Sequence, residues 1–148
     1  MTSSAKANAD LRGAAFHEAG HAVVASALGL IVSRIEIGIG GDDAKGEADI
    51  QNAHGLPLVD QLAICAAGIE AQAIFAAPTH AGAGWGDYGQ MIELLGDIDD
   101  ETSEILRMAG HRKAYKLLKI QTEKVRRIAD ALLASHRIAG DELIALFN

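Results

Sequence analysis

The sequence predicts a mainly helical α+β protein with a small β-hairpin or sheet and a C-terminal helical arm. Helical periodicity recurs along most of the 148 residues, whereas a two-residue alternation is clear only over residues 31–39. Much of the apolar content is alanine and only 4% of the residues are aromatic, which favours closely packed helices. The length suits a single domain, residues 1–148, with one hydrophobic core.

The N-terminal helix is expected to run from Asp10 to Gly29. Asp10 can cap free backbone N–H groups at its start, and Gly29 easily adopts the left-handed conformation common after a helix end. This places His17 and His21 well inside the helix.

A half-buried strand is expected next, over residues 31–39. Isoleucines occupy one face of it and charged Arg34 and Glu36 the other, with the two-residue period of a strand. The apolar positions are Ile31, Ile35, Ile37 and Ile39. Residues 40–46 are interpreted as a turn, and residues 47–51 as a weaker returning strand.

Two helices are expected in the middle of the chain. Pro57 is a favourable first residue for a largely buried helix that ends at Phe75. After a Gly- and Ala-rich stretch, residues 87–96 are interpreted as a short helix between a capping Asp87 and a terminal glycine.

The C-terminal third predicts a helical hairpin or one long arm. Residues 99–135 are strongly helical, with a split or bend expected at Gly110, and a last short helix should follow a capping Asp141. The positions expected to pack are Met108, Tyr115, Leu118, Val125, Ala129, Leu132, Leu143, Ile144 and Phe147.

The composition and motifs of the chain indicate its cellular location and exclude one class of nucleotide-binding site. The single cysteine, Cys65, cannot form an internal disulfide, and the first residues lack the apolar core of a secretory signal, so we expect a cytoplasmic protein. The longest apolar run, residues 62–69, is too short to span a membrane. No GxxxxGK[ST] loop, which would hold a nucleoside triphosphate, occurs in the chain.

Charge is unevenly distributed along the chain. The net charge is -7, yet residues 101–148 carry 9 basic and 6 acidic side chains, against 4 and 14 in residues 1–100. A basic C-terminal face can dock an acidic partner. Because aromatic residues hardly interleave these Lys and Arg residues, a solvated helix face is favoured, and no nucleic-acid partner is expected.

The most informative segment is AAFHEAGHAVV, residues 14–24. His17 and His21 are four residues apart, so in a helix both rings can reach one ion, as zinc requires. Glu18 is not placed to share that ion, but it can reach a water bound there and remove its proton, the chemistry of HExxH metallopeptidases. Gly20 lets another element approach the helix at this turn. The alternative is a helix whose two histidines are satisfied by hydrogen bonds.

Catalytic zinc commonly has a third protein ligand, which spacing alone does not identify. The metzincin pattern is excluded because Ala27 stands where it requires a histidine. Asp87 also has a structural explanation, since with Gln90 it fits a capping box. The candidates are Asp49, His54, Glu70, His80, Asp87, Asp99 and His111.

Nearly the whole chain resembles the peptidase domain of FtsH-type membrane-anchored ATP-dependent zinc proteases. Five segments carry the resemblance, in the order found in that family: HEAGHAVVA, VSRIEIGIG, LAICAAGIEAQAIF, GAGWGDYGQMIEL and ADALLASHRIAGDELIALF. The chain lacks the family's AAA ATPase module and membrane anchors, the usual arginine of the segment around Glu70, and the family's spacing near Trp85 and Gly86.

The resemblance implies a site and a mode of substrate binding. It implies that His17, His21 and Asp87 bind Zn²⁺ and that Glu18 is the general base. It also implies that the strand over residues 31–39 is an edge that takes an extended polypeptide as a further strand. An ordinary strand covering the core is the alternative for that segment.

Two hypotheses from different classes follow. The first is a stand-alone zinc metalloendopeptidase that acts on flexible or unfolded polypeptides, with a separate ATPase or a homo-oligomer as candidate partners. The second is a non-catalytic adaptor or assembly module that keeps the zinc fold and uses its basic C-terminal helical face. The intact HEAGH segment argues for the first, because a purely structural zinc would more often have four protein ligands and no need of Glu18.

Overall fold

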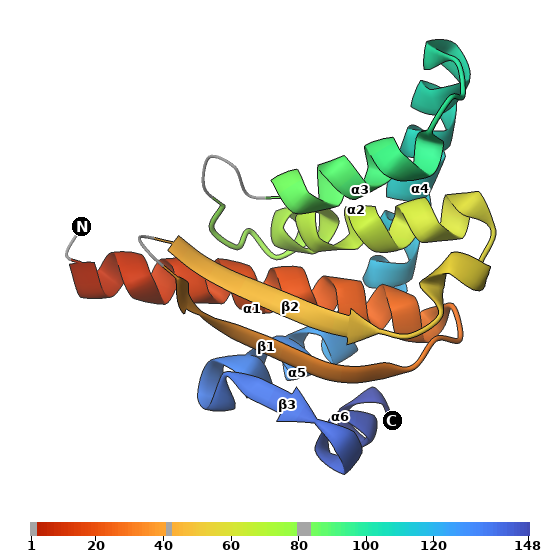
Figure 1. Ribbon diagram of the computed structural model, residues 1–148. Coiled ribbons are helices and arrows are strands. Elements are labelled where there is room, and N and C mark those ends of the chain that lie inside the picture. Colours follow the sequence, from red (N-terminus) through yellow and green to blue (C-terminus); the bar gives the residue numbers. More distant parts are fainter. Residues whose placement is uncertain (1–2, 41–42, 80–83) are drawn as a thin grey trace.

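The computed structural model of this chain describes residues 3–40, 43–79 and 84–148. It is mainly helical with a small antiparallel sheet, as the sequence predicts (Figure 1). In chain order the elements are α1 (Ser3–Ala27), β1 (Val32–Gly40), β2 (Asp43–Ile50), the 3-10 turn η1 (Ala53–Gly55), α2 (Leu58–Ile74), α3 (Trp85–Leu95), α4 (Asp100–Ile120), α5 (Thr122–Ser135), β3 (Arg137–Ala139) and α6 (Gly140–Phe147).

Helix α1 lies at the centre of the fold, with the sheet, α2 and α5 packed around it (Figure 1). It begins earlier than predicted, because no helix-breaking residue precedes Asp10. Asp10 is therefore not a cap; instead it accepts from Lys6 one turn before it, with 2.7 Å between Nζ and Oδ2. Gly29 follows the helix end at a φ of 88°, as its predicted role requires.

The sheet has the order β2-β1-β3, so β1 is its central strand. Ile35 and Ile37 are buried against the core as expected, whereas Ile31 and Ile39, at the strand ends, are 65% and 52% exposed. β1 pairs with β2 along most of its length and with β3 over residues 34–36. The expectation that β1 is an edge strand is therefore wrong. β2 and β3 are the edge strands, and β2 is the one whose residues line the large cleft of the molecule.

β2 is longer than the returning strand expected at residues 47–51. The interpretation of residues 40–46 as a turn is wrong for residues 43–46, which pair with residues 37–40 of β1. Residues 41 and 42 lie outside the described residues. The polar composition of residues 43–46 suits an edge strand with one solvent-exposed face, and the same composition is typical of a turn.

Helix α2 is the second buried helix and lies between α1 and α4. Gly20 of α1 faces it, and a Cβ there would lie 2.6 Å from the carbonyl oxygen of Ala67 and from the Cβ of Ala71. The predicted close approach at Gly20 is confirmed. Gly110 has the same role on the other side, since a Cβ there would lie 2.7 Å from that of Leu62.

The C-terminal helices divide at Gln121, so the expected split at Gly110 is wrong. Gly110 is buried inside a continuous α4, where close packing on α2 is worth more than helix propensity. Asp141 lies in the first turn of α6 and is not its cap. The expected packing positions are buried at Leu118, Val125, Ala129, Leu132 and Leu143, partly buried at Phe147, and exposed at Met108, Tyr115 and Ile144.

Replacing Gly20 by valine should destabilise the protein strongly. The new side chain would overlap the backbone of α2, and overpacking of this kind costs about 1–3 kcal/mol or more of the free energy of unfolding. Urea denaturation measures the change. Gly89→Ala is the matched control, because a Cβ there meets open space. This substitution should raise the free energy of unfolding by up to about 1 kcal/mol, since alanine has the higher helix propensity. Equal stability of Gly20→Val and the natural protein would contradict the packing.

Within the described residues, no helix combines the length and the apolarity that crossing a bilayer requires.

Candidate metal centre

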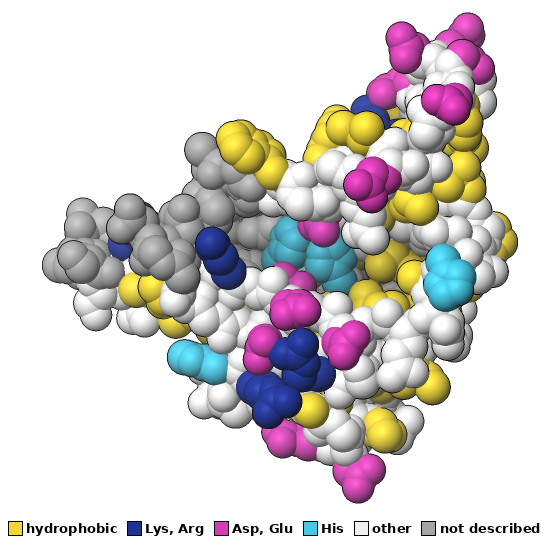
Figure 2. Space-filling view, in the orientation of Figure 1, with side chains coloured by type: hydrophobic (Ala, Val, Ile, Leu, Met, Phe, Trp, Pro, Cys, Tyr) yellow, Lys and Arg dark blue, Asp and Glu magenta, His cyan; other side chains and the backbone are white. Residues whose placement is uncertain are grey.

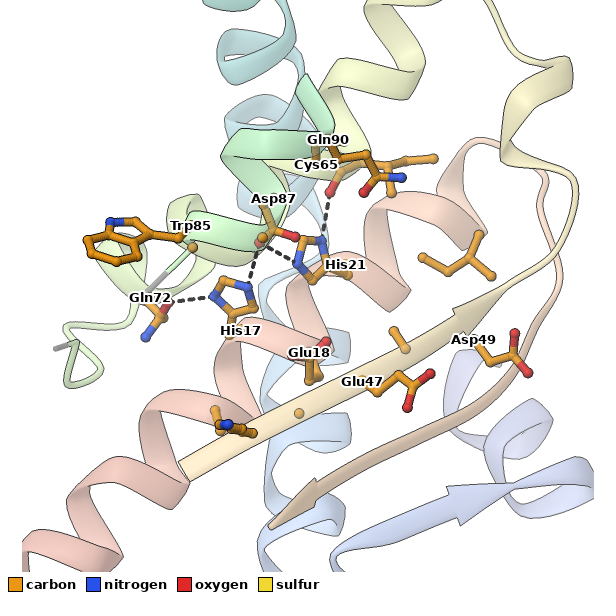
Figure 3. Close-up of a pocket in the computed structure, with 18 of the residues that line it drawn as sticks. His17, Glu18, His21, Glu47, Asp49, Cys65, Gln72, Trp85, Asp87 and Gln90 are labelled. Atoms are coloured by element: carbon orange, nitrogen blue, oxygen red, sulfur yellow. Dashed lines mark hydrogen bonds and ion pairs between the residues drawn. The ribbon is translucent and has the colours of Figure 1, made fainter. Parts of the chain in front are cut away.

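Three side chains predicted as zinc ligands meet at one point, between α1 and the start of α3 (Figure 3). The Nε2 atoms of His17 and His21 lie 2.8 Å and 3.1 Å from the Oδ2 atom of Asp87. The possible ligand atoms of the three residues all lie within 4.8 Å of one another. The two histidine-to-aspartate distances are close to the roughly 3.3 Å that separates tetrahedral ligands placed about 2 Å from one ion.

Asp87 reaches this point from the first turn of α3. Gly84, at a φ of 82°, is the N-cap of that helix, so Asp87 lies one turn inside it. The capping box expected for Asp87 and Gln90 is therefore wrong. The Asp87 carboxylate is directed to the two histidines and not to the backbone of its own helix.

Hydrogen bonds behind the rings fix which nitrogen of each histidine faces Asp87. The carbonyl oxygen of Ile64, which can only accept, lies 2.7 Å from Nδ1 of His21. For His17 the acceptor is Oε1 of Gln72, 2.6 Å from Nδ1, and the Gln72 amide is oriented because its Nε2 donates to the carbonyl of Pro78 at 2.9 Å. Both Nδ1 atoms therefore carry protons, which leaves both Nε2 lone pairs for a ligand.

Two imidazole lone pairs and a carboxylate oxygen cannot converge favourably without a positive charge between them. The set of donors, two nitrogens and one oxygen, is the set found at open catalytic zinc sites, and the acceptors behind both rings are the support that such ligands usually have. The residues present thus fit a zinc ion, with room left for a further ligand in the cleft that they line.

Without a metal, protons have to supply the positive charge. Burial alone would lower the pKa of His21, but the hydrogen bond and charge of Asp87 raise it to about 9. Burial would likewise raise the pKa of Asp87, but the hydrogen bonds from His17 and His21 hold it well below its usual range. A metal binding at neutral pH therefore has to displace a proton from His21.

Two glycines make room for the reactive side chains. A Cβ at Gly68 of α2 would overlap the His17 ring, and a Cβ at Gly46 of β2 would overlap the carboxylate of Glu18. These close approaches fix the two side chains between α2 and β2, so that substitution of either glycine would move one of them.

Glu18 is a buried charged residue of the same region that lacks a hydrogen-bond or ion-pair partner among the described residues. Its side chain is only 7% exposed, and burial raises the pKa of its carboxyl group. No hydrogen bond or ion pair joins it to another of the described residues, although it lines the same cleft as His17 and His21. A buried carboxylate without a partner is costly, and such groups are concentrated where chemistry requires them.

The cleft has a volume of about 680 Å³ and opens beside the three-residue cluster. In the space-filling view the histidines lie at the bottom of a hollow with acidic side chains near its mouth (Figure 2). β2 forms one wall, and α3 with the 77% exposed Trp85 forms the other (Figure 3). An extended chain can therefore enter between a strand edge and a helix.

No protein-family model matches this chain, and no curated protein matches it. The geometry of the cleft and the cluster is therefore what bears on its function.

The other candidates for a third ligand lie elsewhere or have other roles. Glu70 accepts from Nδ1 of His111 at 2.8 Å, and Asp99 caps α4 by accepting from the backbone N–H of Thr102 at 2.9 Å. His54 is exposed on η1, and Asp49 lines the cleft from β2 without joining the cluster. His80 lies outside the described residues.

Sequence reasoning missed Gln72, whose amide orients His17. A signal was present, because Gln72 is a polar residue at helical spacing from the apolar residues Cys65 and Ile69 of α2 and is only 4% exposed. A buried polar side chain needs a partner, but the sequence does not say which one.

Cys65 should react slowly with alkylating reagents in the folded protein. Burial, and then the negative charge of Asp87, raise the pKa of its thiol to about 11, so little thiolate exists at pH 8. We expect iodoacetamide to modify the folded chain at least about tenfold more slowly than the chain in denaturant, as mass spectrometry can measure. Equal rates in the two states would show that α2 opens readily around Cys65.

Proposed function

We propose that this chain is a zinc-dependent metalloendopeptidase similar to the peptidase domain of FtsH-type proteases. One observation carries the proposal: the Nε2 atoms of His17 and His21, each backed by an acceptor at Nδ1, converge on Oδ2 of Asp87. The unpartnered Glu18 carboxylate in the same cleft supports hydrolysis over a purely structural site.

His17, His21 and Asp87 would hold the zinc ion. When bound, zinc polarises a carbonyl group and lowers the pKa of a water molecule. Glu18 takes the proton of the attacking water and afterwards delivers a proton to the leaving amine, so the amide bond breaks without a covalent enzyme intermediate.

The free edge of β2 is suited to hold the substrate. β2 lines the cleft, and an extended polypeptide can pair with its unpaired backbone groups and so pass beside the cluster. Substrates bound in this way have to be extended, which restricts cleavage to flexible or unfolded segments unless a separate ATPase supplies them.

The test is hydrolysis of an unfolded polypeptide by the purified, zinc-loaded chain. We expect cleavage that stops on removal of the metal with a chelator and on addition of a small hydroxamate, which occupies the open position of a catalytic zinc. Zinc binding without hydrolysis and without hydroxamate binding would instead favour the adaptor that uses the basic C-terminal helical face.

A further inference from the structure

We infer that the cleft selects polypeptide segments that carry basic side chains at alternate positions, through Glu47 and Asp49 on the free edge of β2. The inference rests on the proposed function for its substrate class. It specifies the charge of the preferred substrate and the two residues of this chain that recognise that charge.

The pairing of β2 determines which of its side chains face a substrate strand. Gly46 lies against Glu18, and Ala44 is buried, so this set of alternate positions faces the interior. Lys45, Glu47 and Asp49 belong to the opposite set and face outward. A strand added to β2 would place alternate side chains directly beside these three, at cross-strand distances of roughly 5 Å.

The acids of this edge are incompletely neutralised. Arg34 of β1 lies 2.5 Å from Glu36 and, at 3.6 Å, makes a second and longer contact with Glu47, whose side chain is 64% exposed. Asp49 forms no ion pair with any residue that the structure describes. Glu36 also lies 3.8 Å from Arg137 of β3, so two arginines contact Glu36 and Glu47, while no described residue forms an ion pair with Asp49 at the open edge.

The interior of the cleft adds a second, independent attraction for positive charge. The carboxylate of Glu18 is buried, unpartnered and lines the same cleft. Lys45 is the basic residue on this edge, and it lies two positions before Glu47, so the acidic part of the edge is limited to its second half. The predicted preference is therefore for lysine or arginine at the two substrate positions beside Glu47 and Asp49.

Binding of three labelled peptides to the zinc-loaded Glu18→Gln variant tests this inference. That variant should cleave no peptide and lacks the Glu18 charge, so any preference it shows is due to Glu47 and Asp49. The peptides are identical except at two alternate positions, which hold lysine, glutamine or glutamate, and fluorescence anisotropy gives the dissociation constants. We expect the lysine peptide to bind about threefold to tenfold more tightly than the glutamine peptide, and the glutamate peptide more weakly than either. The difference should shrink in about 0.5 M salt.

Two double variants in the same background assign the preference to residues. E47Q/D49N should abolish it, whereas E123Q/E142Q, which removes two exposed acids from α5 and α6 outside the cleft, should keep it. Equal binding of the lysine and glutamine peptides, or a preference that survives E47Q/D49N, would overturn the inference, as would the absence of binding of all three peptides.

Hydrolysis of the same peptides by the natural chain separates this inference from the proposed function. Cleavage of the lysine and glutamine peptides at equal rates would overturn the charge preference but would still support the proposed peptidase activity. A preference in binding that is lost in E47Q/D49N, with no peptide cleaved, would support the acidic edge and contradict the peptidase.

Discussion

Glu18→Gln should abolish peptide hydrolysis while zinc remains bound. Glutamine has nearly the same shape and keeps the contact with β2 at Gly46, but it cannot accept a proton from water. General-base catalysis contributes about 10²–10⁴-fold, so kcat should fall by at least that amount, and zinc content should not change. Measuring turnover and bound zinc on one preparation distinguishes loss of the base from loss of the metal.

Glu93→Gln is the matched control, because Glu93 is an exposed acid of α3 that does not line the cleft. Its turnover should equal that of the natural protein. Full activity in Glu18→Gln would rule out Glu18 as the base.

The same substitution should stabilise the metal-free protein at neutral pH. The pKa of Glu18 is raised by burial, so the folded state holds its proton more tightly than the unfolded chain, whose value is near 4.5. Stability contributed by Glu18 is therefore present below that pH and is lost as the pH rises through the folded pKa. We expect Glu18→Gln to gain about 0.5–2 kcal/mol at pH 7.5, and the gain to vanish near pH 4. An unchanged melting temperature at both pH values would contradict the buried carboxylate.

Asp87→Ala should lose most of the zinc affinity. It removes the Asp87 carboxylate oxygen that lies within hydrogen-bonding distance of both Nε2 atoms, and the change should exceed the roughly 10- to 100-fold loss seen when only a supporting hydrogen bond is removed. Competition titration with a chromophoric chelator measures the affinity. Because Asp87 is partly exposed on the first turn of α3, the fold should persist, as circular dichroism can check.

Glu70→Ala is the informative comparison for Asp87→Ala. Glu70 was an equally acceptable third ligand by spacing, but it is paired with His111 between α2 and α4. Its removal should cost some stability and leave zinc affinity unchanged. The opposite result, with zinc lost in Glu70→Ala and kept in Asp87→Ala, would mean that the cluster is not the metal site.

The parts of the site that are local in sequence could be predicted from it. His17, Glu18 and His21 lie on one helix, so helical periodicity alone sets their relation. Asp87 is 66 residues from His21, and the residues by themselves left seven candidates; its selection came from the resemblance to a known family. The interactions that orient the rings, from Gln72 and the Ile64 carbonyl, arise only from the packing of α1 on α2.

The errors in the predicted fold share a physical cause. An aspartate before an apolar run is typical of a helix start, and this pattern predicts helix caps at Asp10, Asp87 and Asp141. In each case the helix begins earlier, and tertiary contacts or neighbouring residues determine its first turn. β3 was missed because three residues carry too little periodicity to indicate a strand, and its stability depends on pairing with β1.

The measurement that tests the central claim most directly is the zinc content of protein purified without added metal. Elemental analysis of the natural chain should give about one zinc ion per chain, and the His17→Ala variant should have little or none. Absence of zinc from the natural chain, with none bound on titration, would contradict the account and leave the two histidines as hydrogen-bonded residues of α1.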